Sequence, residues 1–119
     1  MTAGEYCNRE VIIVEPAISV TEAAVLMRRH HVGDLVVVEK EGEEARPVGI
    51  ITDRDIVIEV VAQKIDPDSL TVKDIMSTDP VRVAETVSLL DTLELMKQRG
   101  VRRVLVIADS GGLQGLLSA

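Results

Sequence analysis

The chain repeats itself, and this internal repeat limits the possible folds more than any other feature of the sequence. Aligning Met27 with Met96 shifts the chain by 69 residues, and the shift holds along an ungapped run. Six pairs in that run are identical: Val14/Val83, Ser19/Ser88, Leu26/Leu95, Met27/Met96, Val32/Val101 and Val37/Val106. Six further pairs keep their apolar character, which a chance alignment would not maintain. A unit that occurs twice in one chain is expected to fold twice in the same way.

The repeat continues past a loop whose length differs between the copies. The first copy has three more residues in the loop after Lys40, so that Gly49 matches Gly115 at a shift of 66 residues. On either side of this loop both copies contain short Val-rich runs, which indicate buried strands. We expect strands at 11–14, 35–39 and 48–51 in the first copy and at 81–83, 104–108 and 113–117 in the second.

Each copy also carries a helix start signal between its first two strands. Ser19-Val20-Thr21-Glu22 fits a capping box, and Ser88 begins a near equivalent. Helices of about ten residues should follow, and Gly100 and Gly33 are expected in left-handed turns at their ends. Buried stripes are predicted at Ala23, Ala24, Leu26 and Met27, and at Leu89, Leu90, Leu93 and Met96.

The fold class that follows is α+β, with two pseudo-symmetric repeats in the order strand, helix, strand, strand, helix (β-α-β-β-α). One unit of about 55 residues is only marginally stable alone, so the sheets of the two units are expected to pack face to face. The expected domains are 1–66, with the N-terminal segment and first repeat, and 67–119, with the linker and second repeat. A helix over 53–63 closes the first repeat, whereas the second lacks its final helix. Because that helix is nearly all apolar, we expect a homodimer through the helices.

Composition excludes several classes of protein. The 119 residues carry a formal net charge of −7, and Tyr6 is the only aromatic residue among Phe, Trp and Tyr. Binding to nucleic acid is therefore not expected, because the chain has neither a basic excess nor stacking side chains. No apolar stretch approaches the roughly 20 residues of a membrane span, and the N-terminus lacks a signal pattern. With Cys7 as its single cysteine, the chain is expected to be cytoplasmic and to bind no membrane.

One corner of the first copy places polar side chains beside an apolar strand. In Gly49-Ile50-Ile51-Thr52-Asp53-Arg54-Asp55 the strand runs directly into a helix, where Thr52 can act as N-cap and Asp55 is the third helical residue. A carboxylate can accept hydrogen bonds from a diol, and a hydroxyl beside free backbone N–H groups favours an anion. The same Thr-x-x-Asp pattern stabilises a helix without any ligand, so a purely structural role stays open.

Other candidate groups give weaker signals. Arg102 and Arg103 lie beyond a helix end, where dipole complementarity does not require them, so an anion-facing role is an alternative to a solvated one. Adjacent histidines such as His30-His31 point about 100° apart on a helix and have no evident third ligand, so no metal site is expected. The chain also lacks a nucleophile and base in a recognisable arrangement. We therefore expect no catalytic residue, no required cofactor and no enzyme.

The repeat and its motifs resemble the tandem CBS (cystathionine-β-synthase) domain pair, also called a Bateman module. The resemblance covers roughly 11–119 and depends on the doubled arrangement, on Val-Gly-Asp-Leu-Val-Val-Val and Val-Arg-Arg-Val-Leu-Val-Ile, and on the run that ends at Asp55. That run looks like the family's glycine, two apolar residues, Thr or Ser, two residues, then Asp. The resemblance implies a regulatory, signal-transduction module that binds an adenosine-containing ligand (AMP, ADP, ATP, S-adenosylmethionine or NAD(H)) in clefts between the repeats.

The resemblance also implies roles for individual residues. Asp55 would bind the ribose hydroxyls, and Thr52 the phosphate or ribose. The adenine would lie against aliphatic groups near the start of the second copy, and the paired arginines would face phosphates of a ligand such as AMP or ATP. The ligand-binding residues expected are therefore Thr52, Asp53, Asp55, Thr78, Pro80, Val81, Arg102, Arg103 and Ser118.

The second copy departs from the family pattern. Ser118 matches Thr52, but the residue matching Asp55 would be number 121, beyond the last residue, so the second ribose site is incomplete. We expect a trimmed chain over a natural end, because a core without its closing helix exposes apolar surface. A partner protein, which the sequence does not identify, would respond to the ligand. The alternative is a ligand-free oligomerisation or protein-docking module whose helix caps are purely structural.

Overall fold

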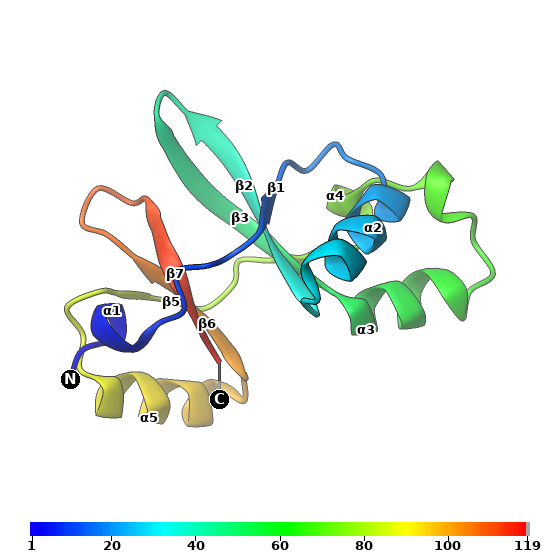
Figure 1. Ribbon diagram of the computed structural model, residues 1–119. Coiled ribbons are helices and arrows are strands. Elements are labelled where there is room, and N and C mark those ends of the chain that lie inside the picture. The colour runs from blue at the N-terminus through cyan, green and yellow to red at the C-terminus, as the bar shows by residue number, and fades with distance from the viewer. Residues whose placement is uncertain (119) are drawn as a thin grey trace. The chain divides into compact units, whose positions relative to one another are not determined.

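The structure, a computed structural model, describes residues 1–118 and forms two compact units (Figure 1). The repeat-1 unit consists of Ile12–Glu39 and Pro47–Asp79, and the repeat-2 unit consists of Met1–Val11, Lys40–Arg46 and Pro80–Ala119. This grouping differs from the expected division at residue 66. The N-terminal segment groups with the second repeat, and the linker groups with the first.

The repeat-1 unit contains a four-stranded sheet in the order β1-β2-β3-β4. β1 pairs with β2 in parallel and β3 pairs with β4 antiparallel. The expected helix over 53–63 forms as one turn of α-helix followed by a π-helix. The elements are β1 (Ile13–Val14), α2 (Val20–His30), β2 (Asp34–Glu41), β3 (Glu44–Thr52), α3 (Asp53–Ile56), the π-helix η1 (Val57–Val61), the 3-10 helix η2 (Pro67–Ser69), α4 (Val72–Ile75) and β4 (Ser77–Thr78).

The repeat-2 unit contains a three-stranded sheet in the order β5-β6-β7. β5 pairs with β6 in parallel, and β6 pairs with β7 antiparallel. Together with the repeat-1 unit, this arrangement confirms the predicted α+β class. The elements are α1 (Ala3–Tyr6), β5 (Arg82–Ala84), α5 (Leu89–Arg99), β6 (Arg103–Ile107) and β7 (Leu113–Ser118).

The two long helices begin as predicted but differ in how they end. The Ser19 and Ser88 side chains accept hydrogen bonds from the third residue of α2 and of α5. Gly100 ends α5 in the left-handed conformation, at a φ of 65°. The prediction that Gly33 serves this purpose for α2 is wrong, because His31 takes the left-handed position at a φ of 54°. His31 is the residue that matches Gly100 at the shift of 69.

Aliphatic side chains from the strands and from one face of each long helix form the cores. The predicted stripes are only partly buried. Ala24 is exposed, and Leu90 and Leu93 of α5 are 80% and 40% exposed. The buried core of the repeat-1 unit is Val14, Ala23, Met27, Leu35, Val37, Ile51 and Val72. That of the repeat-2 unit is Ala3, Val83, Met96, Val104, Val106 and Leu117.

The structure extends the repeat to the N-terminus. Thr2–Asn8 and Thr71–Ser77 are related by the same shift of 69, and both form a one-turn helix with a capping box followed by extended backbone. The N-cap residues Thr2 and Thr71 have the same φ of −99° and ψ of 163°. Each then bridges to the N-cap serine of the long helix in its unit. The linker therefore completes the first repeat as the N-terminal segment completes the second.

These segments lie against glycines at the matching position of the third strand of each unit. A Cβ atom at Gly115 would lie 2.6 Å from the backbone oxygen of Asn8, and one at Gly49 would lie 2.8 Å from that of Ser77. Asn8 and Leu116 exchange backbone hydrogen bonds of 2.8 and 2.9 Å beside this contact. The absence of a side chain at Gly115 thus allows the N-terminal segment to pair with β7.

We predict that Gly115→Ala lowers the free energy of unfolding by about 1–3 kcal/mol, because the new methyl group meets backbone that cannot move away cheaply. Gly112→Ala is the control, since a Cβ there would have its nearest neighbours at an ordinary 3.7 Å. Denaturant unfolding measures both. Equal stability of the two variants would contradict the role given to Gly115.

Candidate functional site

The polar corner predicted at Thr52 forms where β3 passes into α3. Thr52 is extended, and its hydroxyl oxygen accepts a hydrogen bond from the backbone N–H of Asp55 at 3.1 Å. In return, Oδ2 of Asp55 accepts from the backbone N–H of Thr52 at 2.9 Å. Both side chains are half-buried. The predicted N-cap is confirmed, and its reciprocal bonds fix the two side chains relative to each other.

The expectation that free N–H groups at this helix start receive an anion is wrong. The N–H of Asp53 donates to the backbone oxygen of Gly33 at 3.0 Å, and the N–H of Arg54 donates to Oδ1 of Asp53 at 2.8 Å. The N–H groups of Thr52 and Asp55 are occupied by the capping box. All four backbone donors from residue 52 to residue 55 are therefore already used.

The polar atoms left at the corner are mainly acceptors. Oδ2 of Asp55 is used by the cap, which leaves Oδ1 for another donor. Asp53 is exposed, and its Oδ2 lies 3.2 Å from where a Cβ of Gly33 would be. The Thr52 hydroxyl already accepts one hydrogen bond and keeps its own proton to donate. Such a set suits a ligand that presents hydroxyl groups.

The other predicted residues lie in different places. Thr78 is exposed on β4, opposite Gly49 of the neighbouring strand β3. The remaining five belong to the repeat-2 unit, where Arg103 of β6 pairs directly with Ser118 of β7. The structure thus brings Thr52, Asp53 and Asp55 into one turn and places Arg103 beside Ser118. The residues of this second set are Pro80, Val81, Arg102, Arg103 and Ser118.

Sequence reasoning missed two residues next to these positions. Gly33 holds the N–H of Asp53, and Arg9 matches Thr78 at the shift of 69. The Arg9 guanidinium donates to the backbone oxygen of Gly4 at 2.8 Å and to Oε1 of Gln114 at 3.1 Å. Extending the repeat upstream of residue 11 would have found Arg9. No sequence signal pointed to Gly33 as a hydrogen-bond acceptor.

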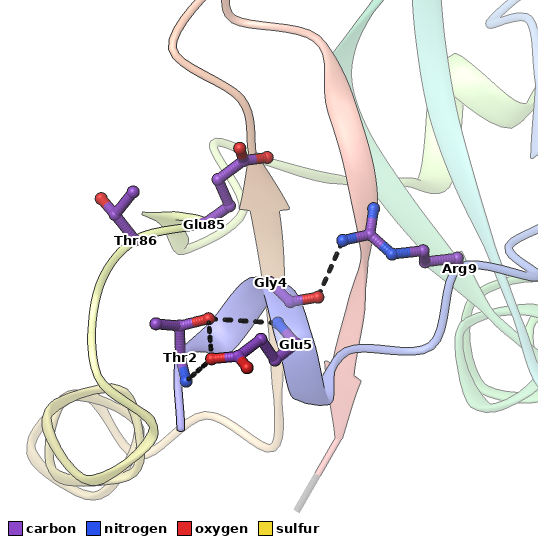
Figure 2. Close-up of a pocket in the computed structure, with 6 residues that line it drawn as sticks. All are labelled: Thr2, Gly4, Glu5, Arg9, Glu85 and Thr86. Carbon is purple, nitrogen blue, oxygen red and sulfur yellow. Dashed lines mark hydrogen bonds between the residues drawn. The ribbon is translucent and has the colours of Figure 1, made fainter.

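A cavity of about 280 Å³ lies in the repeat-2 unit beside α1 (Figure 2). Its polar groups largely bind one another. The backbone N–H and the hydroxyl of Thr2 donate to Oε1 of Glu5, and these bonds lower the pKa of Glu5. Arg9 is held by the oxygen of Gly4, as Figure 2 shows. The cavity therefore reflects the cap of α1. It is lined by Thr2, Gly4, Glu5, Arg9, Glu85 and Thr86.

Two searches of residues 1–118 bear on other kinds of site. Within this range no three His, Cys, Asp or Glu side chains gather closely enough to hold a metal ion. No helix in the same range has the length and apolar character needed to cross a membrane.

Comparison with known families decides the wider assignment. A family model described as CBS domain matches residues 3–62 and again 72–119. The chain belongs to the CBS domain family. The two matched segments follow the two sequence repeats, which confirms the predicted tandem pair.

Curated relatives share this pair within longer proteins. An uncharacterized protein of Methanopyrus kandleri is 37% identical over 118 residues, which are 99% of this chain and 59% of the relative. An inosine-5′-monophosphate dehydrogenase of Korarchaeum cryptofilum is 34% identical over 98% of this chain and 22% of the enzyme. This CBS pair thus spans only part of the length of these relatives.

Solved structures of CBS proteins match the whole chain. A CBS domain protein from Pyrobaculum aerophilum complexed with AMP has a TM-score of 0.86 and 27% identity, covering 99% of this chain and 87% of that one. A hexameric CBS-CP12 protein from bloom-forming cyanobacteria has a TM-score of 0.85 and 28% identity over 100% of this chain and 67% of that one. These similarities support a regulatory nucleotide-binding module of the CBS type.

Proposed function

We propose that this CBS pair is a non-catalytic sensor that binds an adenosine-containing ligand, with AMP or ATP as the candidates, through the turn formed by Thr52, Asp53 and Asp55. The observation that carries the proposal is the capping box, which holds the Asp55 carboxylate half-buried with Oδ1 left for a further donor. The AMP complex of the Pyrobaculum aerophilum protein, which has the same fold, supports a ligand of this class.

The chemistry of the turn fits the ribose end of such a ligand. A cis-diol presents two O–H donors, and a carboxylate oxygen is a strong acceptor for them. The Thr52 hydroxyl can donate to a ribose oxygen while its oxygen still accepts from Asp55. Roles for Thr78, Pro80 and Val81 at the adenine, and for Arg102, Arg103 and Ser118 at phosphates, remain predictions from the family resemblance.

Ligand binding would act by shifting the population of conformations rather than by chemistry on the ligand. A ligand that binds one arrangement of a protein more tightly than another stabilises it by the difference in binding free energy. We infer that a partner protein in the cytoplasm reads this difference. We found no nucleophile paired with a base among residues 1–118 that would support catalysis.

We predict that Asp55→Asn weakens AMP binding by about tenfold or more, because a charge-assisted hydrogen bond to the ribose becomes a neutral one. Isothermal titration calorimetry measures the change. Asp74→Asn is the matched control, since Asp74 closes the same kind of capping box on α4, where Thr71 N–H donates to its carboxylate at 2.8 Å. In both variants the asparagine oxygen can still accept the capping bond. Equal loss of affinity in both variants, or in neither, would count against the site.

A second function, oligomerisation, is favoured by exposed apolar side chains on the helices. Val57, Ile58 and Val61 of η1 are exposed, Val61 by 64%, and Leu90 of α5 is 80% exposed. Side chains of this size gain about 1.5–3 kcal/mol each when fully buried. We propose that these faces form a homodimer, consistent with the hexameric CBS-CP12 relative. A module that only oligomerised would need no ligand.

The expected homodimer should depend on these side chains. We predict that Val61→Asp shifts the protein from dimer toward monomer in sedimentation equilibrium, because a buried carboxylate lacks a partner. Asp66→Lys, a charge change on the exposed loop after η1, would not serve because Asp66 caps η2; Gln63→Asp is the control instead. A wild-type monomer at all concentrations would exclude the dimer.

A further inference from the structure

We propose that Asp53 determines specificity at this turn by closing the helix start to phosphate, so that the site favours AMP over ATP. The inference deepens the proposed function and depends on it. It comes from the way the backbone N–H groups of α3 are satisfied, compared with the two other capping boxes of the chain.

In the other two boxes, backbone oxygens accept from the first two N–H groups of the helix. The second of these donors in α1, Gly4 N–H, bonds to Glu85 O at 2.9 Å. The second in α4, Lys73 N–H, bonds to Pro16 O at 3.0 Å. In α3 the corresponding donor, Arg54 N–H, is instead taken by the Asp53 carboxylate at 2.8 Å. Only in α3 does a side chain at the first helical position decide whether this donor is free.

A capping box does not require this aspartate. The first helical positions of α1 and α4 are Ala3 and Val72, which have no polar side chain, and both boxes form. Asp53 therefore adds something beyond the cap. Its carboxylate blocks a backbone donor that an anion could use, and it adds a second negative charge to the turn that already carries Asp55.

Gly33 keeps this carboxylate in place. The backbone oxygen of Gly33 accepts from Asp53 N–H at 3.0 Å, and Oδ2 of Asp53 lies 3.2 Å from the position of a Cβ on Gly33. A side chain at residue 33 would push against the carboxylate. The matching position in the second repeat holds Arg102. The two repeats thus place opposite chemistry at equivalent sites, a bare glycine backed by a carboxylate in one and a cation in the other.

The consequence concerns how much negative charge a ligand can bring to the turn. Hydroxyl donors of the ribose meet acceptors there, whereas each added phosphate is repelled by the carboxylates of Asp53 and Asp55. Because Asp53 is exposed, this repulsion is screened by salt. Wild-type protein should therefore bind AMP more tightly than magnesium-free ATP, with the preference largest at low ionic strength.

The experiment measures the ratio of the ATP and AMP dissociation constants by calorimetry, in EDTA, for wild type, Asp53→Asn and Asp53→Ala. Asp53→Asn removes the charge and keeps an oxygen that can hold Arg54 N–H, whereas Asp53→Ala also frees that N–H. We expect the ratio to fall by about threefold in Asp53→Asn and about tenfold in Asp53→Ala at low salt, and less at high salt. Asp68→Asn, which removes one charge from the exposed helix η2, is the control and should change the ratio less than about twofold.

The outcomes separate the two proposals. If wild type binds AMP but both Asp53 variants keep its ATP to AMP ratio, the role of Asp53 is wrong and the nucleotide site stands. If Asp68→Asn changes the ratio as much as Asp53→Asn, overall charge and not the turn decides the preference, which also overturns the role. If wild type binds neither nucleotide, the proposed function and this inference both fail.

Discussion

The reciprocal hydrogen bonds between Thr52 and Asp55 are the interaction on which the structure of the site depends. They end β3, begin α3 and hold a half-buried carboxylate with one oxygen left over. A cap of this kind contributes about 1 kcal/mol to stability, so it is explained without a ligand. What it adds to function is order, since a carboxylate that is already fixed loses little freedom when a ligand binds.

The repeat shows which features belong to the fold and which are specific to one site. Three one-turn helices begin with a threonine, and each has an acidic residue at its third position. Two of them, α1 and α4, lie across a unit from their sheet's third strand, where Gly115 and Gly49 leave room for backbone. Only α3 follows the third strand directly and carries Asp53. The shared features build the fold, and the differences point to the ligand.

The sequence predicted the parts of the molecule that local pattern controls. The shift of 69 residues and the serine caps gave the tandem pair, the long helices and most strands, because each depends on spacing along the chain. Packing overrode pattern at Leu90, which lies in an apolar stripe yet is exposed, and at the N-terminus, which joins the second repeat across some 70 residues of sequence. The N–H groups of α3 could not be assigned from sequence, because their acceptor at Gly33 comes from a different loop.

The central claim is that Asp55 accepts hydrogen bonds from ribose hydroxyls. It is tested most directly by comparing the binding of AMP and of 2′,3′-dideoxy-AMP to the wild-type protein by calorimetry, since the two ligands differ only in those hydroxyls. A weakening of about tenfold or more for the dideoxy ligand is the predicted result, as expected for the loss of a hydrogen bond to a charged group. Equal affinity for the two ligands would contradict the claim and leave the capping box with a structural role alone.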